Sequence, residues 1–216
     1  MRHDAGMSTT EPAPRYIWFD LEFTDLDPEK AHLLQVAVLA TDVHLQLLQP
    51  ADKGLNLLLR LKDGATISEW VEQNLPDLLA ECRSEHALDA HTAETHITSY
   101  LDRLVGPAPD DIKERPVMAG NSVHNDWRLA CMHYPALIGR LHYRLLDVST
   151  LKQQWQGWLG QPEFDKEDAS LIKEYLPFET GDLEGKPHDA YYDILASIAE
   201  LNYYRRHLCK TITPSE

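Results

Sequence analysis

The chain has 216 residues, of which 43% are apolar, and a formal net charge of −15 at pH 7. This length is typical of a single domain with a substantial core, and no apolar run is long enough to cross a bilayer. A strongly acidic chain has no overall attraction to a long polyanion, so binding of long duplex nucleic acid is not expected. A short phosphorylated substrate is compatible with this charge where metal ions supply positive charge locally.

The three cysteines are odd in number and far apart, at Cys82, Cys131 and Cys209. They match neither a zinc-binding pattern nor a disulfide framework, which favours a reducing cytoplasm. Residues 1–15 lack the apolar stretch of a signal peptide and contain acidic residues, so we expect a disordered leader. The expected location is cytoplasmic, without attachment to a membrane.

The first half of the chain predicts a small sheet followed by helices. Apolar runs separated by turn residues predict strands over 16–23, 33–40 and 55–61. Their short links favour an antiparallel meander. The pattern becomes helical from Ser68, with Pro76 as a break or a first-turn residue, and helical spacing returns over 93–105.

The second half alternates strands with helices. The predicted elements are a strand over 116–119, a helix over 124–134 stopped by Pro135, a strand over 143–148, a helix through Trp158 capped by Ser149–Thr150, a short helical piece over 171–175 and a helix over 189–207. Strands first, then strands alternating with helices, predict an α/β fold with a mixed sheet flanked by helices. The folded domain is expected to span 16–209, with a flexible tail over 210–216.

Asp20 and Glu22 interrupt the apolar first strand. Side chains at i and i+2 of a strand point to the same side, so the two carboxylates are expected to lie together. Carboxylates beside a buried strand repel each other and lose hydration, and a hard divalent cation would relieve both effects. The alternative for this stretch alone is a strand end where both acids reach water.

Asp126, Asp193 and His188 are candidates to join this pair. Asp126 lies in the first turns of a helix after a short strand, where ligands of open α/β sheets usually bind. Asp193 lies one turn into the last helix, and His188 is expected to project from the loop before it, because five residues is not a same-face spacing. Taken singly, each is more often a solvated or capping residue.

Together, four carboxylates and one histidine are what a two-metal phosphodiester hydrolase needs. The acids can hold two Mg²⁺ or Mn²⁺ ions, and a neutral histidine can accept a proton from water. Sequence separation alone does not bring the five residues together.

The same residues stand in an order that resembles the DEDDh exonucleases and, more specifically, the oligoribonuclease family. The motifs are Asp20-Leu-Glu22 followed by Thr24 and Leu26-Asp-Pro, then Gly120-Asn-Ser with Asp126, then His188-x4-Asp193. Residues 142–152 and 197–205 are also similar to segments typical of that family. The resemblance covers roughly 17–207, with gaps.

This resemblance implies an RNase H-like fold, a homodimer and 3′-to-5′ hydrolysis of short single-stranded RNAs, from di- to penta-nucleotides. It implies that Asp20, Glu22, Asp126 and Asp193 bind the metals and that His188 is the general base. It also implies that Leu26 wedges against a base, that Trp70 lines the nucleotide pocket, that Ser122 lies near the phosphate and that Tyr143 reaches the partner's active site. For Trp70 and Tyr143, ordinary core or interface packing is the alternative.

The chain departs from the family pattern near the expected substrate site. Asp25 stands where the family has a glycine, and residues 71–75 lack a substrate-contacting histidine. Asn125 and Trp127 flank Asp126 where the family usually differs, and the segment 161–187 is longer and more acidic than expected. These departures leave the five predicted hydrolytic residues intact. What they put in question is whether the chain shares the family's preference for substrate length.

Two other functions compete with this interpretation. The same site could trim DNA ends or longer RNA, which predicts a basic track that the charge of −15 disfavours. A catalytically silent dimeric binding protein predicts loss of at least one acid or of the histidine, whereas all five are present.

Overall fold

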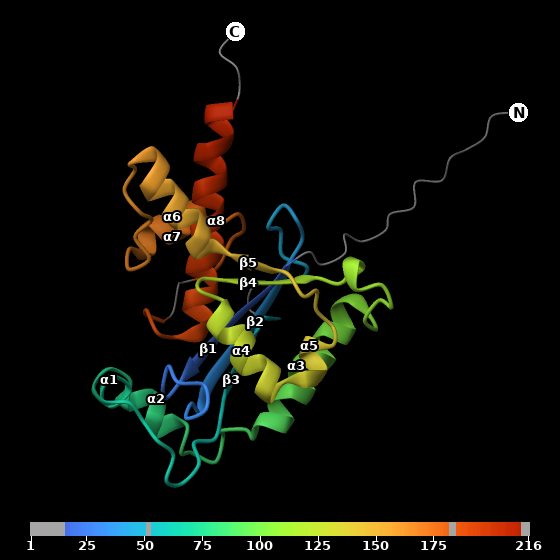
Figure 1. The fold of residues 1–216 in the computed structure, drawn as a ribbon, viewed down its shortest axis with the longest axis vertical. Helices are drawn as coiled ribbons and strands as arrows, with labels where there is room; N and C mark the ends of the chain where they lie inside the picture. The colour runs from blue at the N-terminus through green and yellow to red at the C-terminus, as the bar shows by residue number, and fades with distance from the viewer. Residues whose placement is uncertain (1–15, 51–52, 182–184, 213–216) are drawn as a thin grey trace, which may run out of the picture.

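A five-stranded mixed sheet forms the centre of the computed structural model, which describes residues 16–50, 53–181 and 185–212 (Figure 1). The strands are β1 (Tyr16–Phe23), β2 (Leu33–Thr41), β3 (Leu55–Leu58), β4 (Val117–Gly120) and β5 (Leu145–Asp147), in the spatial order β3-β2-β1-β4-β5. The first three strands form the predicted antiparallel meander, while β4 runs parallel to β1 and β5 runs parallel to β4. The predicted α/β fold with a mixed sheet is confirmed.

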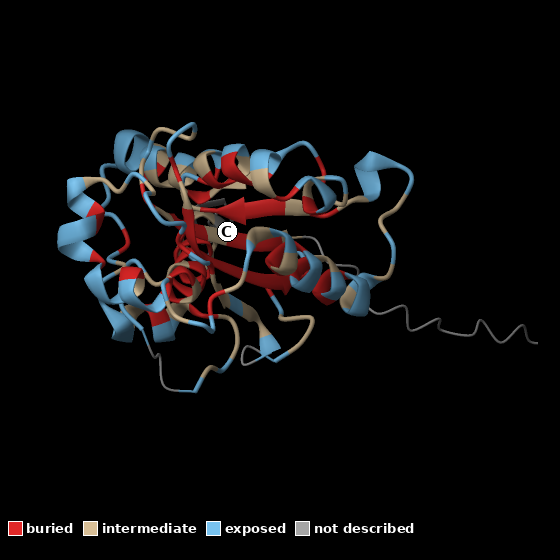
Figure 2. Ribbon diagram, turned by 90° about the horizontal axis from the view of Figure 1, so that it is seen from below, coloured by how far each residue is buried: buried red, intermediate tan, exposed pale blue. Residues whose placement is uncertain are grey.

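Helices cover both faces of the sheet, so the strands form the buried middle layer in Figure 2. One face packs against α3 (Ala90–Val105), α4 (His124–His133) and α5 (Pro135–Ile138). The other face packs against α6 (Val148–Leu159), α7 (Ala169–Tyr175) and α8 (Ala190–Ile212). Two short helices, α1 (Glu69–Asn74) and α2 (Pro76–Glu81), adjoin a smaller apolar cluster, and a 3-10 turn spans Ile112–Glu114. None of the described helices is long and apolar enough to span a membrane.

Residues of β1 alternate between the two cores. Ile17, Phe19 and Leu21 are buried on the α3/α4 side, whereas Trp18 is buried on the α8 side. The period of two residues therefore directs Asp20 and Glu22 toward α8, at the end of the strand. The same alternation that buries the apolar residues of β1 therefore determines which face of the sheet carries its two acids.

Two predicted strands are shorter in the structure. Leu59 makes the last contact with β2, donating to the Leu34 carbonyl at 2.8 Å. On its other side the chain pairs with Leu88, which donates to the Leu58 carbonyl at 2.9 Å and accepts from the Arg60 N–H at 2.8 Å. The prediction of a strand over 55–61 is therefore wrong beyond Leu58. Likewise, the strand predicted over 143–148 contains only Leu145–Asp147.

Helix ends differ from the prediction where a side chain caps the backbone. The predicted cap at Ser149–Thr150 is wrong, because Asp147 is the N-cap of α6 and accepts a hydrogen bond from the Ser149 N–H at 3.0 Å.

Helix α8 continues to Ile212, so the first part of the predicted flexible tail is helical. The predicted leader, 1–15, lies outside the described residues.

Candidate active site

The turn between β4 and α4 brings Asp126 to the end of β1. A Cβ atom on Gly120 would lie 3.0 Å from the Phe19 carbonyl oxygen, so a side chain here would crowd the backbone of β1 and glycine is favoured. Ser122 has a positive φ of 50°, and its N–H donates to the Asp147 carboxylate and to the Ser149 hydroxyl, each at 2.9 Å. These contacts fix the start of α4.

Asp126 connects α4 directly to the strand that carries the other acids. It lies in the first turn of the helix and is 5% exposed. Its Oδ1 accepts a hydrogen bond from the Leu21 N–H at 2.9 Å, between the positions of Asp20 and Glu22. One carboxylate oxygen is thereby held by the backbone, which orients the other for a ligand.

The loop before α8 and the first turn of that helix supply His188 and Asp193, as expected from their spacing. His188 has a left-handed φ of 68°, and its N–H donates to Asp193 Oδ2 at 3.0 Å. A ligand atom from each of Glu22, His188 and Asp193 lies within 4.8 Å of the other two. A strand and the junction between a loop and a helix, which are distant in sequence, thus meet at one point.

Burial raises the pKa of all four carboxyl groups, and repulsion from nearby acids adds to the rise. For Glu22, burial first and then the charges of Asp193 and Asp126 raise the pKa to about 8. Burial raises the pKa of Asp126 to about 7, and burial followed by the neighbouring acids raises that of Asp20 well above its usual value. Burial also raises the pKa of Asp193. Added positive charge would stabilise the charged forms of such an acid cluster, and its hard oxygen donors fit a divalent metal.

Lys166 is a positively charged residue next to this cluster, and it comes from the acidic segment 161–187. Its Nζ lies 3.5 Å from the fully buried carboxylate of Glu200, which also accepts from Asn121 at 2.9 Å. The ammonium lowers the pKa of Asp20 and Asp193 against the larger effect of burial. Lys166 cannot be identified as a site residue from the sequence, because nothing in its spacing connects it to the motifs.

A cavity of about 470 Å³ opens over the acids. Its walls include all the predicted site residues except Tyr143, namely Asp20, Glu22, Leu26, Trp70, Ser122, Asp126, His188 and Asp193. Leu26 is 80% exposed and Trp70 is 48% exposed, so neither is a core residue. The Trp70 and His188 rings pack edge to face with centroids 4.8 Å apart.

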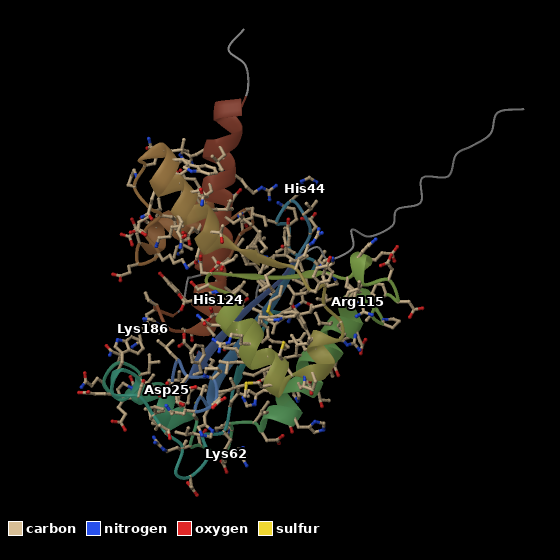
Figure 3. The ribbon with its side chains drawn as sticks, viewed as in Figure 1. Asp25, His44, Lys62, Arg115, His124 and Lys186 are labelled. Atoms are coloured by element: carbon tan, nitrogen blue, oxygen red, sulfur yellow. The ribbon has the colours of Figure 1, made fainter. Side chains whose placement is uncertain are left out.

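Three segments surround this cavity, and Figure 3 labels one residue on each of them: Asp25 after β1, His124 at the start of α4 and Lys186 before α8. Asp25 itself lines the cavity, and its Oδ1 accepts from the Asp27 N–H at 2.8 Å. The unexpected acid therefore stabilises the turn that carries Leu26. His188 is the only histidine among the lining residues that the structure describes.

Tyr143 is the predicted site residue that the structure places elsewhere. The residue is 59% exposed, and its ring packs on His142 with centroids 4.4 Å apart, outside the cavity of its own chain. It is not a core residue. Its predicted contact with the active site of a partner stays a prediction, as do the chemical roles of the residues that line the cavity.

Comparisons with known proteins agree with this geometry. The exonuclease family model (RNase_T) matches residues 17–201. The chain is 34% identical to the oligoribonuclease of Photorhabdus laumondii, over 88% of this chain and 93% of that protein. It is 33% identical to the oligoribonuclease of Sodalis glossinidius, over 90% and 95%, and 31% identical to the mitochondrial oligoribonuclease of Mus musculus, over 97% and 80%.

Solved structures with low sequence identity share the fold. The Mg²⁺- and Mn²⁺-bound structure of S. pombe Pop2p superposes with a TM-score of 0.63 at 8% identity, covering 94% of this chain and 87% of that one. Cell-death related nuclease 4 gives a TM-score of 0.57 at 16% identity, covering 93% and 65%. The family model covers most of the chain, and the curated relatives are matched over most of their length. The chain therefore belongs to the exonuclease family and, within it, to the oligoribonucleases.

Proposed function

We propose that this protein is a metal-dependent 3′-to-5′ exoribonuclease that hydrolyses short single-stranded RNAs, from di- to penta-nucleotides, to nucleoside 5′-monophosphates. The observation that carries the proposal is the meeting of four carboxylates and one histidine at one cavity. Hydrolysis of a phosphodiester needs a group that accepts a proton from water and positive charge near the phosphate. The histidine can supply the first, and the acids can bind cations that supply the second.

Asp20, Glu22, Asp126 and Asp193 would hold two Mg²⁺ or Mn²⁺ ions. Burial and nearby acids raise their pKa values, so bound cations would stabilise the charged forms, and carboxylates are the donors that these ions prefer. The similar fold of Pop2p has been solved with both ions bound. When bound, the ions would polarise the attacking water and neutralise charge on the phosphate.

His188 would accept the proton of the attacking water. The water oxygen forms a bond to phosphorus, the bond from phosphorus to the 3′ oxygen of the preceding nucleotide breaks, and that oxygen takes up a proton from solvent. The products are one nucleoside 5′-monophosphate and an RNA shortened at its 3′ end. His188 is exposed, so it can return its proton to solvent after each turnover.

The cavity favours a short single strand. Leu26 and Trp70 present apolar side chains at its rim, where an unpaired base can stack. Its volume of about 470 Å³ is within the range of small-ligand pockets. A long strand would need a basic track, which the net charge of −15 disfavours, so trimming of DNA ends or longer RNA is the second candidate.

We propose that the protein works as a homodimer in which Tyr143 of each subunit reaches the cavity of the other. Its exposed ring outside the cavity of its own chain supports this arrangement. Equal amounts of Asp20→Asn and Tyr143→Ala should test it, because a mixed dimer contains one site with intact acids and an intact Tyr143 from the other subunit. Re-equilibrated mixtures should recover up to about a quarter of wild-type activity. No recovery in a mixture shown to exchange subunits would contradict the shared site.

The limits of the catalytic domain are proposed as 16–209, which includes the matched range 17–201. Cytoplasmic location also remains a proposal, since the relatives include mitochondrial oligoribonucleases. The presence of all five candidate residues argues against a catalytically silent binding protein.

A length series of 5′-labelled RNA and DNA oligomers with purified protein tests the proposed activity. We expect the highest kcat/KM for RNA dinucleotides, with mononucleotide products in Mg²⁺ or Mn²⁺. A higher kcat/KM for DNA or for long RNA would favour the end-trimming function. Binding without hydrolysis in either metal would favour the silent protein.

A further inference from the structure

The side chain of Gln35 links the start of α8 to the sheet through hydrogen bonds. It lies on β2 directly opposite Glu22 and is 4% exposed. Its Oε1 accepts a hydrogen bond from the Ala190 N–H at 3.1 Å, and its Nε2 donates to Asp189 Oδ2 at 3.1 Å and to Asn56 Oδ1 at 2.8 Å. One side chain thus uses its acceptor and both of its donor hydrogens.

Asp189 receives this contact with one carboxylate oxygen and caps α8 with the other. Its Oδ1 accepts from the N–H groups of Tyr191 and Tyr192 at 3.1 and 3.0 Å. Its own N–H donates to the Lys186 carbonyl at 3.0 Å, which closes the turn around His188. The orientation of the Asp189 carboxylate is therefore fixed from two sides.

His188 lies within this turn in a left-handed conformation that a non-glycine residue keeps only when its surroundings enforce it. Its N–H also donates to Asp193, one turn into the same helix. The geometry points to the Gln35–Asp189 pair as a positioning device, which holds the His188 turn and the first turn of α8 in the arrangement needed for hydrolysis. The inference rests on the proposed function, in which His188 and Asp193 take part in cleavage.

The donor and acceptor pattern gives a test that separates this role from simple helix capping. Asn caps a helix about as well as Asp, so Asp189→Asn keeps the cap, but it places an N–H₂ group against the Gln35 N–H₂ group. Gln35→Glu places a carboxylate against the Asp189 carboxylate. The double variant Gln35→Glu/Asp189→Asn restores a donor facing an acceptor and leaves the Ala190 N–H satisfied.

We expect each single variant to lower kcat on a labelled RNA dinucleotide by roughly 10–100-fold with KM little changed, because small misplacements of catalytic groups have effects of this size. The double variant should recover to within a few-fold of wild type. The two single variants change charge in opposite directions, so an effect of charge alone would move kcat in opposite directions. Gln73→Glu adds the same charge on α1, near this turn, and should keep wild-type kcat.

Each outcome decides between the alternatives. Single variants that fold and keep wild-type kcat would overturn the inference, as would a double variant no better than either single one. A loss of thermal stability with unchanged kcat would show capping alone. If Gln35→Glu does not fold, Gln35→Met removes the same hydrogen bonds without added charge and should lower kcat similarly. An inactive wild type would instead contradict the proposed function, and the positioning role would fail with it.

Discussion

Asp193→Asn should stabilise the metal-free protein, and bound Mg²⁺ should cancel most of that advantage over the wild type. Atoms of Glu22 and Asp193 lie within 4.8 Å of each other. At that separation two unit charges in a medium with an effective dielectric constant of about 20 repel by about 3 kcal/mol. Asn is close to Asp in shape and can still accept the hydrogen bond from the His188 N–H. The substitution therefore removes repulsion with little change in packing.

The pH of the measurement follows from the direction of the pKa shift. The pKa of Glu22 is raised from 4.5 to about 8 on folding. Its contribution to stability is therefore present below pH 4.5 and is lost as the pH rises through about 8. At about pH 9, in a chelator, we expect Asp193→Asn to raise Tm by up to roughly 6–12 °C, since a domain of this size gains about 2–4 °C per kcal/mol.

Added Mg²⁺ should cancel most of this difference. A ligand at 100 times its Kd stabilises a protein by about 2.7 kcal/mol, so Mg²⁺ should raise the Tm of the wild type by roughly 5–11 °C and that of the variant far less. Glu29→Gln, at an exposed acid outside the cavity, should leave both transitions within about 0.5 kcal/mol of wild type. A variant less stable than wild type in the chelator, or an equal effect of Mg²⁺ on both proteins, would refute the reasoning.

Three further substitutions test separate parts of the account. His188→Ala should lower kcat by about 10²–10⁴-fold while keeping the Mg²⁺-induced rise in Tm, since it removes a proton acceptor; loss of that rise would instead make His188 a metal ligand. Trp70→Ala should weaken dinucleotide binding by about 1–3 kcal/mol, measured with Ca²⁺ in place of Mg²⁺ or Mn²⁺. Unchanged binding would exclude stacking of a base on Trp70. Gly120→Ala should lower stability by about 1–3 kcal/mol in a urea titration, because its Cβ would lie 3.0 Å from the Phe19 carbonyl oxygen. Its control, Gly157→Ala in α6, has no atom within 4 Å and should be stabilising; equal effects would contradict the close-approach argument.

The sequence predicted the parts of the fold that local patterns determine. The alternation of β1 placed Asp20 and Glu22 on one face, and the structure shows that face turned toward α8. The break before α8 placed His188 in a loop, where it lies. These features depend on the period of two residues and on helix spacing, which neighbouring residues alone specify.

The remaining errors come from contacts that no local pattern reports. The strand predicted over 55–61 is shorter in the structure because the chain pairs with Leu88. Helix α6 begins earlier than predicted because Asp147 caps it. In the sequence, Gln35 is one residue of a predicted apolar strand. In the structure its side-chain amide accepts a hydrogen bond from the Ala190 N–H at the start of α8, 155 residues away. The meeting of Asp126 with β1 depends on the placement of β4 beside β1, and only the family resemblance anticipated it.

Cleavage of an RNA dinucleotide by the wild type and by Asp20→Asn tests the central claim most directly. With Mn²⁺ present, the wild type should convert a 5′-phosphorylated dinucleotide completely to two nucleoside 5′-monophosphates, and Asp20→Asn should be slower by at least about 10³-fold while it stays folded. A wild type that leaves the dinucleotide intact, or an Asp20→Asn variant with wild-type turnover, would contradict the proposed metal-dependent exoribonuclease.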